Sequence, residues 1–122
     1  MKNKIIPEIR QLFDDADNQI RSNAYISLIN LSDFRFGIDA VIDSGIIPTL
    51  IDKLVLEKEE PILILILELI KLLAEGEKAP NLLLACPSLA RLNTHLVSKN
   101  PLIRELAALN IGSISFNVLG KE

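Results

Sequence analysis

The sequence has 122 residues, of which 49% are hydrophobic but only 4% aromatic, and its formal net charge is −3. A chain of this length holds one domain with a buried core, and its apolar content excludes a disordered protein. Its 13 basic residues are scattered along the chain, which argues against nucleic acid as a partner because phosphate binding needs a clustered positive face.

No segment is predicted to cross a membrane. The most apolar run, "ILILIL" at 62–67, is followed by Glu68 and Lys71, and it is far shorter than the roughly 20 residues that a spanning helix needs. The single cysteine, Cys86, cannot form an internal disulfide, which favours a reducing, cytoplasmic location. The amino terminus lacks a signal-peptide pattern because Pro7 and Glu8 interrupt its apolar residues.

The predicted elements are all helices. The first starts at "IIP", where Pro7 occupies the first turn and needs no N–H. Longer helices are predicted at 19–31, 61–74 and 102–115, after polar breaks whose Asp and Asn residues can cap them. Short helices are predicted at 35–45 and 77–87, and Gly45 suits the left-handed end of the first. The expected fold class is all-α.

An internal repeat organises these helices. The phrase "IIP" occurs at 5–7 and again at 46–48, an offset of 41 at which Phe13 falls on Leu54 and Leu28 on Leu69. A weaker third copy follows at an offset of 42, and its long helix aligns with that of the first unit at an offset of 83. A period near 41 residues predicts an α-solenoid of about three units, which we place at 5–45, 46–87 and, incomplete, 88–122.

Four phrases resemble the armadillo-repeat family and, for the last, the related HEAT repeats. They are "SLINLSD" at 27–33, "AVIDSG" at 40–45, "GIIPTLIDKL" at 45–54 and "NPLIRELAALNIG" at 100–112. The resemblance implies a single right-handed superhelix whose long helices line a concave protein-binding face, without a cofactor. A narrower resemblance, to armadillo-type radial spoke proteins, implies a scaffold in the ciliary axoneme.

The resemblance also implies where a partner would bind. In armadillo proteins that hold extended peptides, an Asn near the end of each long helix bonds the peptide main chain, and Asn30 matches it. Lys71 and Ser113 stand at its expected equivalents, so this polar ladder is interrupted. For Asn30 itself, a hydrogen bond at the helix end and a ligand contact both remain open.

Apolar residues stand one turn before these positions. We expect Ile26, Leu67 and Leu109, with Leu63, to form a strip that receives a helix or hydrophobic segment of another protein. The expected partner-binding residues are therefore Ile26, Asn30, Leu63, Leu67, Lys71, Leu109 and Ser113.

The sequence contains few residues that could form a catalytic or metal site. The only thiol and imidazole are Cys86, in an apolar context before Pro87, and His95, expected on a helix surface. A zinc site would need about four Cys or His ligands, so no metal or cofactor is expected. Two acidic clusters, Asp14–Asp17 and Glu57–Glu60, lie in equivalent loops without calcium-loop spacing, which favours solvated charge or an acidic ridge that meets a basic partner.

Arg21 and Arg104 occupy equivalent places at the starts of two long helices. Each is expected to reach the acidic loop of a neighbouring unit, with Asp17 and Asn100 as local partners, although a partner-binding role stays open.

The sequence thus favours a non-catalytic interaction or scaffolding module. The alternatives are an adaptor that binds an extended peptide or cargo, and, remotely, an enzyme. Neither end of the array carries an obvious polar cap, so we expect either a segment of a longer array or open ends that stack against a partner or a second copy of the chain.

Overall fold

The computed structural model describes residues 5–120, with side chains described as far as residue 116. Within this part of the chain every regular element is a helix, so the all-α prediction is confirmed. In chain order the elements are α1 (Ile5–Gln11), η2 (Leu12–Asp14), α2 (Asn18–Leu31), α3 (Arg35–Asp43), α4 (Ile47–Leu56), α5 (Glu60–Leu73), α6 (Ala79–Ala85), α7 (Ser88–Thr94), η3 (His95–Val97) and α8 (Pro101–Gly120).

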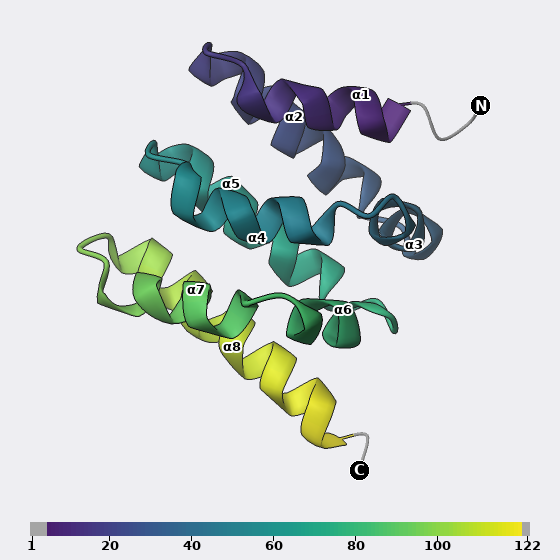
Figure 1. Ribbon diagram of the computed structural model, residues 1–122, viewed down its shortest axis with the longest axis vertical. Coiled ribbons are helices and arrows are strands. Elements are labelled where there is room, and N and C mark those ends of the chain that lie inside the picture. Colours follow the sequence, from purple (N-terminus) through teal and green to yellow (C-terminus); the bar gives the residue numbers. More distant parts are fainter. Residues whose placement is uncertain (1–4, 121–122) are drawn as a thin grey trace.

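The helices stack in three tiers along the long axis of the molecule (Figure 1). The first tier holds α1 and α2, the second α3 to α5, and the third α6 to α8. Helices α1, α4 and α7 lie one below another on the near side, α2, α5 and α8 lie behind them, and α3 and α6 flank the stack on one side.

The long helices begin where the sequence predicts, and for α2 and α8 side-chain capping explains why. The Asp17 carboxylate accepts a hydrogen bond from the Gln19 amide at 2.8 Å, and the Asn100 side chain accepts one from the Leu102 amide at 2.9 Å. These bonds satisfy amides that have no partner inside the first turn. Helix α8 runs to Gly120 rather than ending near 115, and the predicted limit of the third unit at 122 lies outside the described residues.

Two glycines shape the start and end of α3. Gly45 has a φ of 80° after the helix ends, the left-handed conformation predicted for it. At Gly37 a Cβ would lie 1.9 Å from the Leu31 carbonyl oxygen, so only glycine lets the first turn of α3 approach the end of α2 this closely.

One hydrophobic core runs through all three tiers. Its centre is α5, which buries seven apolar side chains: Ile62, Leu63, Ile66, Leu67, Leu69, Ile70 and Leu73. This helix is apolar nearly all round because α2 packs against it from one tier and α8 from the other. No helix in the described part of the chain is long and apolar enough to cross a membrane.

The repeat offset changes inside the second tier. The predicted offset of 41 holds for α1 and α4, where Ile6 and Ile47 are both buried. The cap residue Asp17, however, follows Phe13 by four positions, whereas Glu59 follows Leu54 by five. Helix α5 therefore lies 42 residues after α2, and the extra residue in this loop changes which side chains face outward.

Candidate functional site

The predicted partner-binding residues divide into exposed and buried sets. Ile26 and Leu109 are 40% and 46% exposed, Asn30 and Lys71 are exposed, and Ser113 is half-buried. In contrast, Leu67 is fully buried and Leu63 is only 6% exposed. The prediction that Leu63 and Leu67 face a partner is therefore wrong, because both belong to the core between α5 and its neighbours.

The extra loop residue explains this error. One residue of offset turns a side chain about 100° around a helix. At the observed offset of 42, Leu67 is the equivalent of Tyr25, and both are fully buried. The equivalent of Ile26 is the exposed Glu68, and that of Asn30 is Leu72 rather than Lys71. Sequence reasoning missed Glu68 and Leu72, although the two loop lengths could have revealed them.

The corrected register defines a surface on the long helices. We call it the long-helix face, and its residues are Ile26, Asn30, Glu68, Leu72, Leu109 and Ser113. Each of the helices α2, α5 and α8, which lie side by side, contributes two of these residues. The face therefore carries two clearly exposed apolar side chains, a partly buried leucine and one carboxylate, which suits protein contacts.

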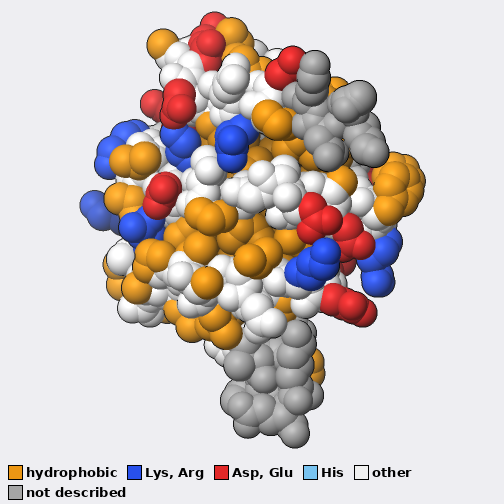
Figure 2. All heavy atoms as spheres, turned by 45° about the vertical axis from the view of Figure 1, so that its right-hand side comes forward, with side chains coloured by type: hydrophobic (Ala, Val, Ile, Leu, Met, Phe, Trp, Pro, Cys, Tyr) orange, Lys and Arg blue, Asp and Glu red, His pale blue; other side chains and the backbone are white. Residues whose placement is uncertain are grey.

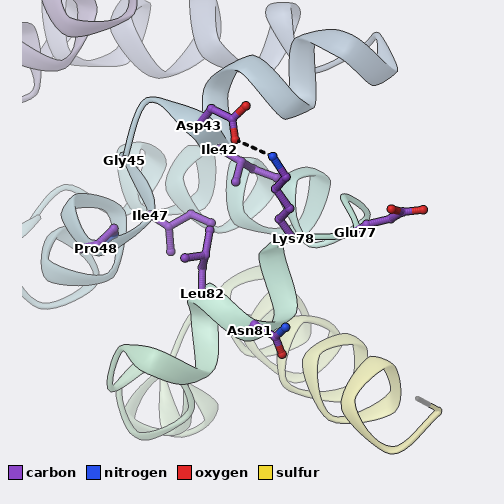
Figure 3. Close-up of a pocket in the computed structure, with 9 residues that line it drawn as sticks. All are labelled: Ile42, Asp43, Gly45, Ile47, Pro48, Glu77, Lys78, Asn81 and Leu82. Carbon is purple, nitrogen blue, oxygen red and sulfur yellow. Dashed lines mark hydrogen bonds and ion pairs between the residues drawn. The ribbon is translucent and has the colours of Figure 1, made fainter. Parts of the chain in front are cut away.

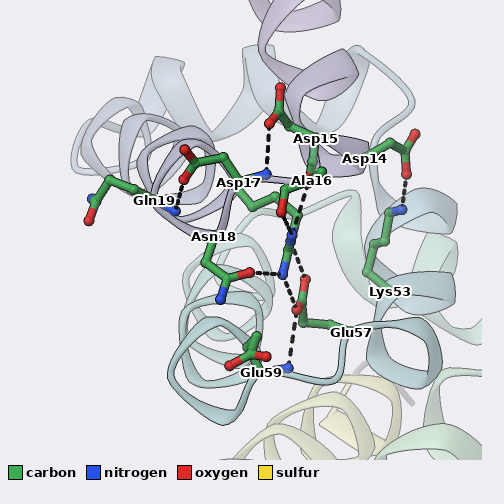
Figure 4. A network of polar contacts seen from close by, with 10 residues as sticks. Asp14, Asp15, Ala16, Asp17, Asn18, Gln19, Lys53, Glu57 and Glu59 are labelled. Atoms are coloured by element: carbon green, nitrogen blue, oxygen red, sulfur yellow. Dashed lines mark hydrogen bonds and ion pairs between the residues drawn. The ribbon is translucent and has the colours of Figure 1, made fainter.

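A polar network ties the first tier to the second (Figure 4). The Arg21 guanidinium donates to both carboxylate oxygens of Glu57, from Nε at 3.0 Å and from Nη2 at 2.9 Å. It also donates to the Asp15 carbonyl at 2.9 Å and to the Asn18 side chain at 2.7 Å. The hydrogen bond with Glu57 raises the pKa of Arg21, so its charge is retained.

This network confirms that Arg21 reaches the neighbouring acidic loop, but it corrects two details. Asp17 caps α2 instead of pairing with Arg21, and Arg104 donates to the Ser98 carbonyl at 2.8 Å rather than to Asn100. The Glu57 side chain is only 5% exposed, so this part of the loop is a structural contact and not solvated charge. Asp14 likewise forms an ion pair with Lys53 of the second tier.

Cys86 and His95 have structural surroundings. Burial raises the pKa of the Cys86 thiol, which disfavours the nucleophilic thiolate. The expected surface position of His95 is wrong, since its side chain is partly buried and its Nε2 lies 2.8 Å from the Leu54 carbonyl oxygen, joining the third tier to the second. No group of three His, Cys, Asp or Glu side chains suited to a metal ion occurs among the described residues.

A pocket of about 760 Å³ lies between the α3–α4 turn and α6 (Figure 3). Its apolar lining comes from Ile42, Ile47, Pro48 and Leu82, and Figure 3 shows Ile47 and Leu82 facing one another. Its polar rim comes from Asp43, Glu77, Lys78 and Asn81. The Lys78 ammonium reaches Asp43 at 3.2 Å, while the Glu77 carboxylate points away from the pocket.

Comparison with known proteins extends only to the fold. No family model and no curated protein matches the sequence. Among solved structures, the chain is similar to an engineered protein whose crystal structure comes from the Northeast Structural Genomics Consortium, with a TM-score of 0.82 and 18% identity. The match covers 92% of this chain and 46% of the engineered protein, so it supports the helical architecture alone.

Proposed function

We propose that the chain is a non-catalytic protein-binding module built from about three armadillo-like repeats. Equivalent contacts in different tiers support the repeat. Arg21 donates to the carbonyl six residues before it, that of Asp15, and Arg104 does the same with Ser98. Equivalent small residues, Ala24 and Ala107, are both buried where adjacent long helices meet.

The observation that carries the binding role is the exposure of large apolar side chains on the long-helix face. Ile26 on α2 and Leu109 on α8 are 40% and 46% exposed, and Leu72 lies between them on α5. Exposed apolar side chains that recur on adjacent helices are typical of protein contacts. The occupant we propose is a helix or hydrophobic segment of another protein.

An adaptor for extended peptides is the second candidate, and the offset of 42 between α2 and α5 changes which residues would form its polar ladder. Such an adaptor would need polar side chains at successive rungs to bond the peptide main chain. Asn30 begins that ladder, but Leu72 replaces the next polar side chain. The apolar character of the middle rung therefore favours side-chain contacts with a partner over a main-chain hydrogen-bond ladder.

The resemblance to armadillo-type radial spoke proteins leads us to propose the ciliary axoneme as its location. The test is affinity capture from ciliated and unciliated cells, with wild type and Leu109→Asp as baits. We expect the wild-type bait to capture axonemal proteins from ciliated cells and the Leu109→Asp bait to capture none of them. Equal capture by both baits would count against the long-helix face, and equal capture from both cell types against the ciliary location.

The control bait is Val97→Asp, since Val97 is 83% exposed and lies outside the long-helix face. It should capture the same proteins as wild type. Sedimentation at several concentrations tests the separate proposal of self-association, which a monomer at every concentration would contradict.

A further inference from the structure

The α3–α6 side of the molecule carries a second exposed surface, remote in sequence from the long-helix face. Phe34 and Phe36 at the start of α3 are 61% and 77% exposed and stack on each other with ring centroids 6.0 Å apart. Phe116 is exposed as well, at 73%, but Phe34 and Phe36 stand together as a pair, and stacked aromatic side chains are frequent anchors in protein interfaces.

Arg35, which stands between the two phenylalanines in the sequence, lines a smaller hollow beside the pocket of Figure 3. Phe36, Asp39 and Asp43 are spaced three and four residues apart, so they follow one stripe of α3. A hollow of about 170 Å³ lined by Arg35, Asp39, Glu77 and Lys78 lies along this stripe. It shares Glu77 and Lys78 with the larger pocket, so the two hollows are neighbours at the boundary between α3 and α6, and we call them together the α3–α6 groove.

Apolar and charged parts alternate along this α3–α6 groove. Phe34 and Phe36 stand at one end, and Leu82, which is 41% exposed, stands at the other with Pro48. Figure 2, turned toward this side of the molecule, shows hydrophobic side chains gathered at the centre of the face with acidic and basic side chains clustered beside them.

The charges between the two ends favour a basic ligand. Three carboxylates, of Asp39, Asp43 and Glu77, and two cations, of Arg35 and Lys78, line the two hollows. The only ion pair that the described residues form here joins Asp43 and Lys78, whose side chains are 57% and 65% exposed. Glu77 therefore has no cation of its own, and its carboxylate points outward (Figure 3).

We propose that the α3–α6 groove binds an extended segment of another protein, with an apolar side chain at each end and a Lys or Arg between them. One apolar side chain stacks on Phe34 and Phe36, and the other enters the pocket beside Leu82. Helix α3 has nine residues, which span about 13 Å. An extended chain covers that distance in about four residues, which sets the spacing of the two apolar side chains.

The probe for this proposal is a phage library of random dodecapeptides, selected on the wild-type protein. We expect enriched peptides to carry two apolar residues about four positions apart with a Lys or Arg between them. A fluorescent synthetic copy of the strongest peptide should bind Leu82→Asp at least about tenfold more weakly than wild type, as loss of a buried anchor does. Phe36→Ser and Glu77→Lys should weaken binding as well.

Leu84→Asp is the matched control, because Leu84 lies on the same helix and is 42% exposed but does not line the pocket. It should bind the peptide like wild type, and circular dichroism should show that every variant is folded. Failure to enrich any peptide, enrichment without the basic residue, or equal binding to wild type and Leu82→Asp would overturn the proposal. Loss of binding in Leu109→Asp alone would assign the peptide to the long-helix face and also overturn it.

Discussion

Removing the Glu57 carboxylate should destabilise the contact between the first two tiers far more than removing an exposed carboxylate. Arg21 forms two hydrogen bonds with Glu57, at 3.0 and 2.9 Å, and the two side chains are only 14% and 5% exposed. Water therefore cannot replace the lost partner easily, and the guanidinium would be left in a partly dehydrated position.

The expected loss in the free energy of unfolding lies between two known limits. Removing one partner of a fully buried ion pair costs about 3–5 kcal/mol, and an exposed pair contributes about 0–1 kcal/mol. Arg21 keeps the Asp15 carbonyl and the Asn18 side chain as acceptors, so for Glu57→Ala we expect a loss of about 2–3 kcal/mol in the free energy of unfolding. For a domain of this size, that loss lowers the melting temperature by about 8–15 °C.

Urea unfolding followed by far-UV circular dichroism measures this loss, and a double-mutant cycle with Arg21→Met isolates the pair. The matched control is Asp43→Ala, which removes an exposed carboxylate from the Asp43–Lys78 pair and should cost less than about 0.5 kcal/mol. Glu57→Gln should fall between the two, because it keeps an acceptor and loses the charge. A coupling energy between Arg21 and Glu57 no larger than that of the exposed pair would refute the reasoning.

Four further substitutions test burial, side-chain ionisation and the close approach of two helices. Leu67→Ala should lower the free energy of unfolding by about 2–5 kcal/mol because it leaves a cavity in the core. Leu109→Ala should lower it by less than about 1 kcal/mol. Equal losses for the two variants in chemical denaturation would contradict the offset of 42 between α2 and α5. Burial raises the pKa of the Tyr25 phenol in the folded protein. As the pH rises, the unfolded chain therefore loses this proton before the folded chain does. Above pH ~10 the free energy of unfolding of the wild type should fall, relative to that of Tyr25→Phe, by up to about 1.4 kcal/mol per pH unit. Because its hydroxyl has no hydrogen-bond partner among the described residues, Tyr25→Phe should be no less stable at neutral pH, and a clear loss of melting temperature there would count against this. Gly37→Ala should destabilise by more than about 2 kcal/mol, since its Cβ would meet the Leu31 carbonyl oxygen at 1.9 Å; an unchanged thermal transition would show that the two helices can separate without cost.

Much of the fold could be predicted because it depends on local rules. Each of these rules affects only a few neighbouring residues. They are the start of a helix at Pro7 or Pro48, the side-chain caps at Asp17 and Asn100, and the left-handed turn at Gly45. Helical spacing of apolar residues then predicts which segments pack. The contact of Arg21 with the next acidic loop was also predictable, because the repeat places that loop beside it.

The exposed surface was predicted less well, because it depends on how each helix is turned about its axis. Leu67 was expected to face a partner and is fully buried, while the exposed Glu68 takes its position and Leu72 is partly buried. The α3–α6 groove had no sequence signal at all, since Asp43 and Lys78 meet only when α6 packs below α3.

By itself, the sequence determined that the chain is all-helical and roughly where its long helices begin. These properties follow from capping, proline geometry and apolar spacing, which act locally. Only the tertiary structure decided which apolar side chains are core and which are surface, because burial depends on which neighbouring helices pack against each face of α5. Leu67 is buried against the neighbouring tiers and the exposed Glu68 takes the position expected for it, because the loop between Leu54 and Glu59 is one residue longer than its equivalent in the first tier.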